Sequence, residues 1–320
     1  MSAPSSFLSP DDAAFAAALA RLGAANPFLA ERIAAERAVL GPAFREEGAQ
    51  WNRHRQTADV PSNTSTILEQ CTAWLARVQA AWPAGGRVRA DESELYRAVG
   101  DFWLFHAYAA RFDALIAAAL GEEGAAAPLE FYGAFKKDVE RLYARPGLQV
   151  LEDHPVPHLF ACTFQIRRAF HNIHHSLVGS SAVMAQLRAA IWQSIFSHDL
   201  ERYRRQLYTR LGDFATLVQG PSGSGKELVA RALALSQYVP YEPRRGGFVG
   251  DFAAGYFPLN LAALSPTGRA GWTSARRRAR FSSMRSARWR RACKSSCCAC
   301  SRPGPSSRWG ARSRASLPAR

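Results

Sequence analysis

A glycine-rich stretch in the last third of the chain constrains its fold more than any other feature. Its residues are Gly220, Pro221, Ser222, Gly223, Ser224, Gly225, Lys226 and Glu227. The stretch from Gly220 to Lys226 has the GxxxxGK spacing of a phosphate-binding loop. Glycines let the backbone curl so that successive N–H groups face phosphate oxygens, and the lysine adds a positive charge near the terminal phosphates. The pattern predicts a nucleotide site at residues 220–227, and the alternative is an ordinary glycine-rich turn.

The residues on both sides of this loop match the context that such a loop requires. Residues 214–218 form a short apolar run that is typical of a buried strand. Residues 227–235 have a helical pattern, which would place a helix N-terminus against the bound anion. The order of strand, glycine loop and helix therefore predicts an α/β unit.

The residue after the lysine departs from the general pattern. Most such loops continue with Ser or Thr, whose hydroxyl reaches Mg²⁺, whereas this chain has Glu227. The run GPSGSGKELVARAL, with GSS at 179–181 before it and YFPLNLAAL at 256–264 after it, resembles the central ATPase domain of sigma-54-dependent transcriptional activators. These activators belong to the AAA+ class of ring ATPases. The resemblance covers residues 177–267, and residues 1–176 match no family known to us.

The resemblance implies both ligands and partners. In that family the domain binds ATP with Mg²⁺, forms a ring, and hydrolyses ATP to remodel the RNA polymerase bound to sigma-54, while a C-terminal helix-turn-helix binds DNA. The family's GAFTGA loop, acidic Walker B strand, sensor residues, arginine fingers and helix-turn-helix have no counterpart in the translated sequence. We therefore expect weak nucleotide binding at best, little or no ATPase turnover and no ring assembly. The alternative enzyme class is a small-molecule kinase with a phosphate loop.

The positive charge of the chain lies entirely in its last 53 residues. The formal net charge is +15, and residues 268–320 contain 14 Arg, one Lys and no acidic residue, which leaves 26 basic and 26 acidic residues in 1–267. Four cysteines lie in the same stretch, namely Cys293, Cys297, Cys298 and Cys300. An arginine-rich arm could make this a basic nucleic-acid-binding protein, and the cysteine cluster could bind a metal.

A third interpretation, which we favour, is that this tail is read out of frame. Permitted codons for residues 281–288, read across the codon boundaries, spell Leu-Leu-Asp-Glu-Ile-Gly-Glu. Those for residues 292–302 spell Val-Gln-Val-Lys-Leu-Leu-Arg-Val-Leu-Gln. Both strings resemble the family's acidic strand and the helix after it. We therefore predict a frameshift after about residue 267 and a disordered basic tail at 268–320.

The N-terminal region, residues 1–176, is predicted to be mainly helical. Ser9-Pro10 and Asn26-Pro27 mark helix starts, and Gly41 marks a helix end. Further helices are expected at 65–81, 92–120, 129–144 and 158–176, with an amphipathic helix from 184 to about 207. The aromatic residues in these helices are expected to pack in the core rather than to line a pocket, and Cys71 and Cys162 to be buried thiols.

Three histidines, His171, His174 and His175, could indicate a metal site. No carboxylate partner is near in sequence, so a solvated basic helix face is favoured. No apolar run is long enough to cross a membrane. We thus expect a cytoplasmic α/β protein with a helical regulatory region at 1–176, a partial AAA+ domain at 177–267 and the tail at 268–320.

Overall fold

The computed structural model describes residues 6–46, 62–83, 85–119, 129–197, 200–210, 216–250, 252 and 255–258. The chain divides into two compact units, Met1–Pro258 and Leu259–Arg320, and every described residue belongs to the first. The predicted tail at 268–320, with its cysteine cluster, lies outside the described residues. The predicted boundary between residues 176 and 177 falls within the first unit, and the domain division remains a prediction.

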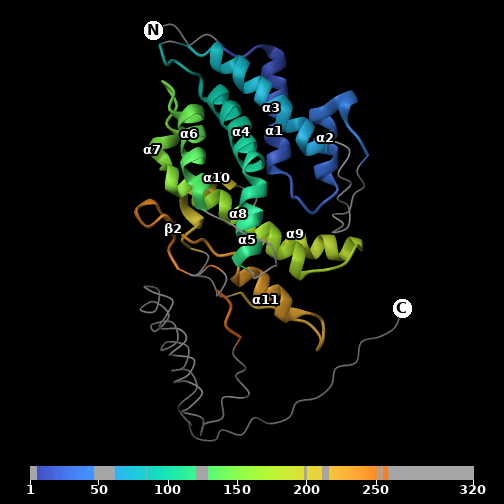
Figure 1. Cartoon of the computed structure of the whole chain (residues 1–320). Helices are drawn as coiled ribbons and strands as arrows, with labels where there is room; N and C mark the ends of the chain where they lie inside the picture. The colour runs from blue at the N-terminus through green and yellow to red at the C-terminus, as the bar shows by residue number, and fades with distance from the viewer. Residues whose placement is uncertain are drawn as a thin grey trace, which may run out of the picture. The chain divides into compact units, whose positions relative to one another are not determined.

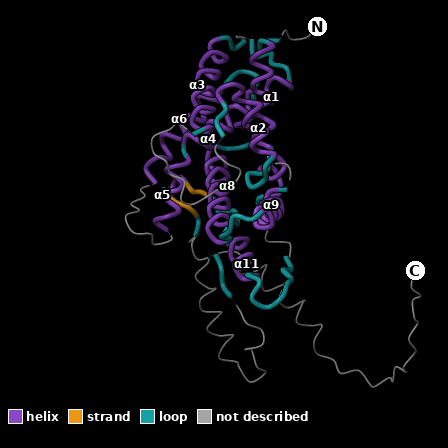
Figure 2. The backbone as a smooth tube through the Cα atoms, turned by 90° about the vertical axis from the view of Figure 1, so that its right-hand side faces the viewer, coloured by secondary structure: helices purple, strands orange, loops and turns teal. Residues whose placement is uncertain are grey.

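The described chain is mostly helical with little sheet, which confirms the helical part of the predicted fold (Figures 1 and 2). The N-terminal helices are α1 (Pro10–Ala24), α2 (Glu31–Leu40), α3 (Asn63–Ala80), α4 (Ala90–Ala107), α5 (Ala109–Ala119), α6 (Tyr132–Tyr143) and α7 (Val150–Asp153). They are followed by α8 (Val156–Ser176), α9 (Ala182–Phe196), α10 (Leu200–Arg202) and α11 (Lys226–Ala234). Single turns of 3₁₀-helix are η1 (Gly41–Ala43), η2 (Leu129–Phe131) and η5 (Pro243–Arg245), while η3 (Tyr203–Leu207) is a π-helix.

Serine caps explain where several of these helices begin. The Ser9 side chain accepts a hydrogen bond from the backbone N–H of Asp12 at 3.1 Å, and Pro10 occupies the first turn of α1. Ser62 and Ser181 accept equivalent bonds at the starts of α3 and α9. Each cap satisfies an N–H group that has no partner inside the helix. The helix start predicted at Ser9-Pro10 is confirmed.

Two predicted helices are interrupted in the structure. The helix expected at 92–120 breaks at Tyr108, whose buried ring packs on Phe135 and whose hydroxyl donates to Asp138 at 2.6 Å. The helix expected at 184–207 breaks at Ser197, which has a φ of +56°. Neither break has a Gly or Pro signal, and at Tyr108 the contacts with α6 are tertiary rather than local.

The sheet is smaller than the α/β prediction requires. In the described residues it consists of two short antiparallel strands, β1 (Tyr241–Glu242) and β2 (Gly247–Phe248), with Tyr241 opposite Phe248. The strand predicted at 214–218 does not form at 216–218, and residues 214 and 215 lie outside the described residues. A buried strand of an α/β unit needs neighbouring strands to pair its backbone N–H and C=O groups. The described residues provide no such neighbours, so this part of the fold prediction is not met there.

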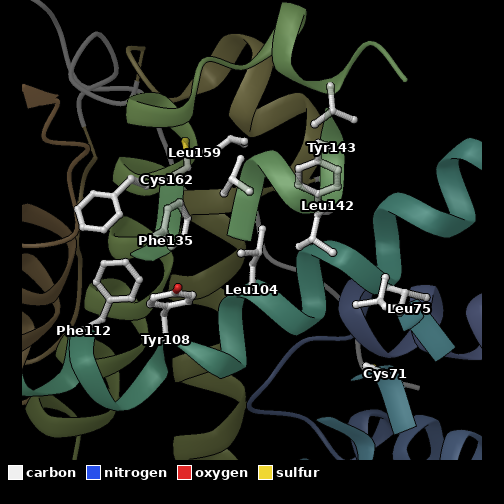
Figure 3. Close-up of a cluster of buried hydrophobic side chains, with 14 of the residues drawn as sticks. Cys71, Leu75, Leu104, Tyr108, Phe112, Phe135, Leu142, Tyr143, Leu159 and Cys162 are labelled. Atoms are coloured by element: carbon white, nitrogen blue, oxygen red, sulfur yellow. The ribbon is translucent and has the colours of Figure 1, made fainter. Parts of the chain in front are cut away.

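Helix α8 contributes to both hydrophobic cores of the unit. The first core lies among α1, α3, α4, α5 and α6, and includes Phe160 and Phe164 of α8. Figure 3 shows part of it, with the rings of Tyr108 and Phe112 near that of Phe135. The second core includes Ile173 of α8 together with residues of α9 and α11. The predicted packing of the aromatic residues in the core is confirmed, and α8 connects the N-terminal helices to the segment that carries the glycine loop.

Candidate functional site

The predicted phosphate loop leads directly into α11. Gly223 and Gly225 adopt left-handed backbone conformations, with φ of +76° and +80°, and Gly225 is the N-cap of the helix. Such conformations strain any residue with a Cβ atom, which explains the glycines. The helix prediction at 227–235 is confirmed to within a residue at each end. By helix geometry, the first N–H groups of α11 have no acceptor within the helix and are available to an anion.

The lysine side chain folds back over its own loop. Lys226 Nζ donates to the carbonyl oxygens of Gly220 at 3.0 Å and of Pro221 at 2.5 Å. The Ser224 hydroxyl donates to the same Pro221 oxygen at 2.8 Å. A Cβ atom on Gly220 would lie 2.9 Å from the Ser224 Oγ, so the first glycine also gives the loop its close internal packing. The loop is therefore a compact turn in which the Lys226 ammonium contacts two of the loop's carbonyl oxygens.

The loop and the residues before it face solvent. Residues 219–224 are exposed, and the Leu217 side chain is 79% exposed although the sequence predicted it in a buried strand. This exposure follows from the missing sheet partners. The glycine loop thus has two left-handed glycines before a helix N-terminus, but the strand expected before it does not form at 216–218.

The end of the loop carries one cation and one carboxylate, Lys226 and Glu227. Glu227 occupies the position where a hydroxyl would reach Mg²⁺, and it is the only acidic residue of the predicted site. Desolvation and the nearby Glu227 carboxylate both raise the pKa of Tyr256. Among the described residues, no group of three or more His, Cys, Asp or Glu side chains could hold a metal ion. Binding of ATP with Mg²⁺ at this loop stays a prediction, and Glu227 is the one carboxylate that the predicted site offers.

The histidines near the end of α8 are not the solvated face that their pattern suggested. The rings of His171 and His175 stack with centroids 3.8 Å apart, and all three side chains are half-buried. Burial, with a contribution from His175, lowers the pKa of His171 to about 4. The expected solvated basic face was therefore wrong for His171, which is neutral near pH 7 because its ring is packed.

The cysteines within the helices are buried free thiols, as predicted. Burial raises the pKa of both Cys71 and Cys162 to about 12. A thiol with such a pKa is scarcely ionised at neutral pH and is a poor nucleophile. These residues act in packing.

Sequence reasoning missed a charged cluster between the helices. Arg204 of η3 pairs with Asp101 of α4, which also accepts a hydrogen bond from the Tyr143 hydroxyl at 2.7 Å. Glu201 of α10 pairs with Arg97 of α4, and His154 Nε2 lies 3.1 Å from its carboxylate. These residues are far apart in sequence, and only the fold brings them together. The local signal was Asp101, which lies among apolar residues in the second half of α4.

Comparisons with known proteins do not assign a family. No family model matches the chain, and no curated protein or solved structure matches it. Within the described part of the chain, no helix has both the length and the apolar character needed to cross a bilayer.

Proposed function

We propose that residues 220–227 bind the phosphates of a nucleotide, ATP by resemblance, and that the segment 177–267 derives from a cytoplasmic sigma-54-dependent transcriptional activator. The geometry of Gly223, Gly225 and Lys226 supports the phosphate site, because left-handed glycines, a helix N-terminus and a lysine coincide in one exposed loop. The sigma-54 assignment is supported by the sequence resemblance alone.

A second observation supports the origin of the segment. Five large apolar side chains are exposed in the described part of the chain, and all five lie between positions 178 and 257. They are Val178, Val183, Leu217, Leu228 and Phe257. Isolated exposed apolar residues are ordinary, but their confinement to one segment is what an α/β domain without most of its sheet would leave uncovered.

Binding without turnover is the activity that this site favours. Hydrolysis of ATP needs acidic groups that place Mg²⁺ and orient water. Glu227 is the only acidic group of the predicted site. In this proposal the main chain of the loop holds the phosphates, and the Lys226 ammonium leaves its two carbonyl partners to face a phosphate oxygen.

The test is the binding of a fluorescent ATP analogue to the full chain, followed by fluorescence anisotropy. We expect Lys226→Ala to weaken binding by about ten- to a hundredfold, because hydrogen bonds to charged groups contribute about 1.5–3 kcal/mol. Lys136→Ala is the matched control, since this lysine is exposed on α6 and pairs with Glu140 on the same helix. Equal affinities for the parent chain and Lys226→Ala would overturn the proposal.

A further inference from the structure

A polar stripe on α8 faces the chain segments that flank the phosphate loop. Its members are His158, Gln165, Arg168 and Asn172. Their spacings of seven, three and four residues place them on one face of the helix. Most other residues in the middle of α8 are apolar and buried, so this stripe is a distinct feature of the helix.

His158 uses both ring nitrogens to join segments on opposite sides of the loop in sequence. Its Nε2 lies 2.9 Å from the carbonyl oxygen of Arg204, in η3 before the loop. Its Nδ1 lies 3.0 Å from the hydroxyl of Tyr238, after α11. A carbonyl oxygen only accepts, so Nε2 carries the proton and Nδ1 accepts from the Tyr238 O–H. The neutral imidazole therefore satisfies both contacts at once.

Ring packing reinforces this junction. The ring of Tyr208, which follows η3, lies 4.4 Å from the His158 ring and 4.7 Å from the Tyr238 ring, centroid to centroid. Burial, which disfavours the imidazolium, lowers the pKa of His158. The three rings thus form one cluster in which each chain segment contacts the other two.

Two further residues of the stripe hold the far end of α11. The Asn172 side-chain amide donates to the carbonyl oxygen of Leu235, the C-cap of α11, at 3.1 Å. The buried Arg168 guanidinium donates to the carbonyl oxygens of Gln237 and Phe252. These carbonyl groups are at and beyond a helix end, where the backbone acceptors have no helical partners. The stripe therefore binds the chain at several points on the C-terminal side of the loop.

We propose that His158 is a positioning residue for the phosphate loop. One of its hydrogen bonds holds the chain before the loop, at Arg204, and the other holds the chain after α11, at Tyr238. The proposal rests on the proposed function at residues 220–227. It adds that the conformation of the exposed loop depends on the contacts of His158, which lies outside the loop. It also follows that nucleotide binding and the His158 junction stabilise each other, since coupling between two sites is reciprocal.

The test compares two buried tyrosines that each donate one hydrogen bond in the full chain. Tyr238→Phe removes the bond to His158. Tyr96→Phe removes a bond of 2.9 Å to the Leu142 carbonyl oxygen in the first core, together with the bond that Tyr96 accepts from Gln79. Amide hydrogen exchange is measured for the peptides that cover residues 216–235. We expect Tyr238→Phe to speed exchange there by about three- to tenfold, the range for losing one buried hydrogen bond. Tyr96→Phe should leave it unchanged.

A second pair of variants separates positioning from packing. His158→Leu removes both hydrogen bonds, whereas His158→Gln keeps one donor and one acceptor in the side chain. We expect His158→Leu to speed exchange at 216–235 and to weaken binding of the fluorescent ATP analogue, and His158→Gln to restore both in part. Equal exchange in Tyr238→Phe and Tyr96→Phe would overturn the positioning role. Faster exchange in Tyr238→Phe, with no nucleotide binding by the parent chain, would instead keep the positioning role and overturn the proposed function.

Discussion

The histidines illustrate how packing changes the chemistry of single side chains. The His106 ring lies 4.3 Å from the Phe102 ring and 5.0 Å from the Phe105 ring, centroid to centroid. Burial, together with the charges of Arg167 and Arg32, lowers the pKa of His106 to about 3. His171 and His158 are also shifted downward, mainly by burial. The residue type was evident from the sequence, but the lowered pKa of His106 follows from burial and from Arg167 and Arg32 on other helices.

These shifts predict that stability falls as the pH falls below about 6.5, the pKa of histidine in an unfolded chain. In that range the unfolded state binds protons that the folded state does not, so the free energy of unfolding decreases. We expect His106→Phe to reduce this slope between pH 5.5 and 6.5 by about 1 kcal/mol per pH unit. Urea unfolding at several pH values measures it. Phe105→Leu, a change in the same contact without a titrating group, should lower stability and keep the slope, and an unchanged slope in His106→Phe would contradict the assignment.

Helices that are distant in sequence are joined by buried charges. Arg204 in η3 is largely buried, which disfavours its charge, yet Asp101 of α4 more than offsets this and raises the pKa of Arg204. Burial acts to raise the pKa of Glu201 of α10, but His154 and Arg97 outweigh it and lower this pKa to about 2. Glu201 and Arg204 therefore keep their charges at neutral pH, and their pairs with Arg97 and Asp101 hold α10 and η3 against α4.

Removing one member of this cluster should leave a buried charge without its partner. We expect Asp101→Asn to lower the free energy of unfolding by about 3–5 kcal/mol, the usual result of breaking a buried ion pair. Urea unfolding followed by circular dichroism measures the change. Asp91→Asn, which affects an exposed pair with Arg89 at the start of the same helix, should leave the unfolding midpoint unchanged. A small effect of Asp101→Asn would show that the pair is well solvated.

The described residues form their cores within the first compact unit. Both hydrophobic clusters consist of residues between Leu8 and Tyr241. The basic residues of the tail belong to the second unit. The buried residues of both cores therefore lie outside the segment that carries the excess charge.

We predict that a chain ending at Pro258 keeps the helical circular dichroism signal and the thermal unfolding midpoint of the full chain, because its core contacts are retained. The same pair of chains tests the basic-protein alternative. Binding of the full chain to duplex DNA that weakens steeply with salt, and is lost in the shorter chain, would favour nucleic-acid binding through the tail. Loss of cooperative unfolding in the shorter chain would contradict the prediction.

Local signals predicted the elements that depend on local interactions. The cap at Ser9, the helix after the glycine loop and the helical runs of the N-terminal region were all predicted, because caps and apolar periodicity act within a few turns. The breaks at Tyr108 and Ser197 were not predicted, since neither residue is a helix breaker. The strand predicted at 214–218 does not form at 216–218, because a strand needs partners that its own residues cannot provide.

The amino-acid sequence alone determined the helical character of the N-terminal region, the glycine turn before α11, and the start of α11 to within one residue. Only the tertiary structure decided that α8 joins both cores and that His158 contacts the segments before and after the loop. The physical reason is the distance along the chain over which each kind of interaction acts. Backbone conformation and capping depend on neighbours a few residues away, whereas buried hydrogen bonds and pKa shifts depend on which distant segments the packing brings together.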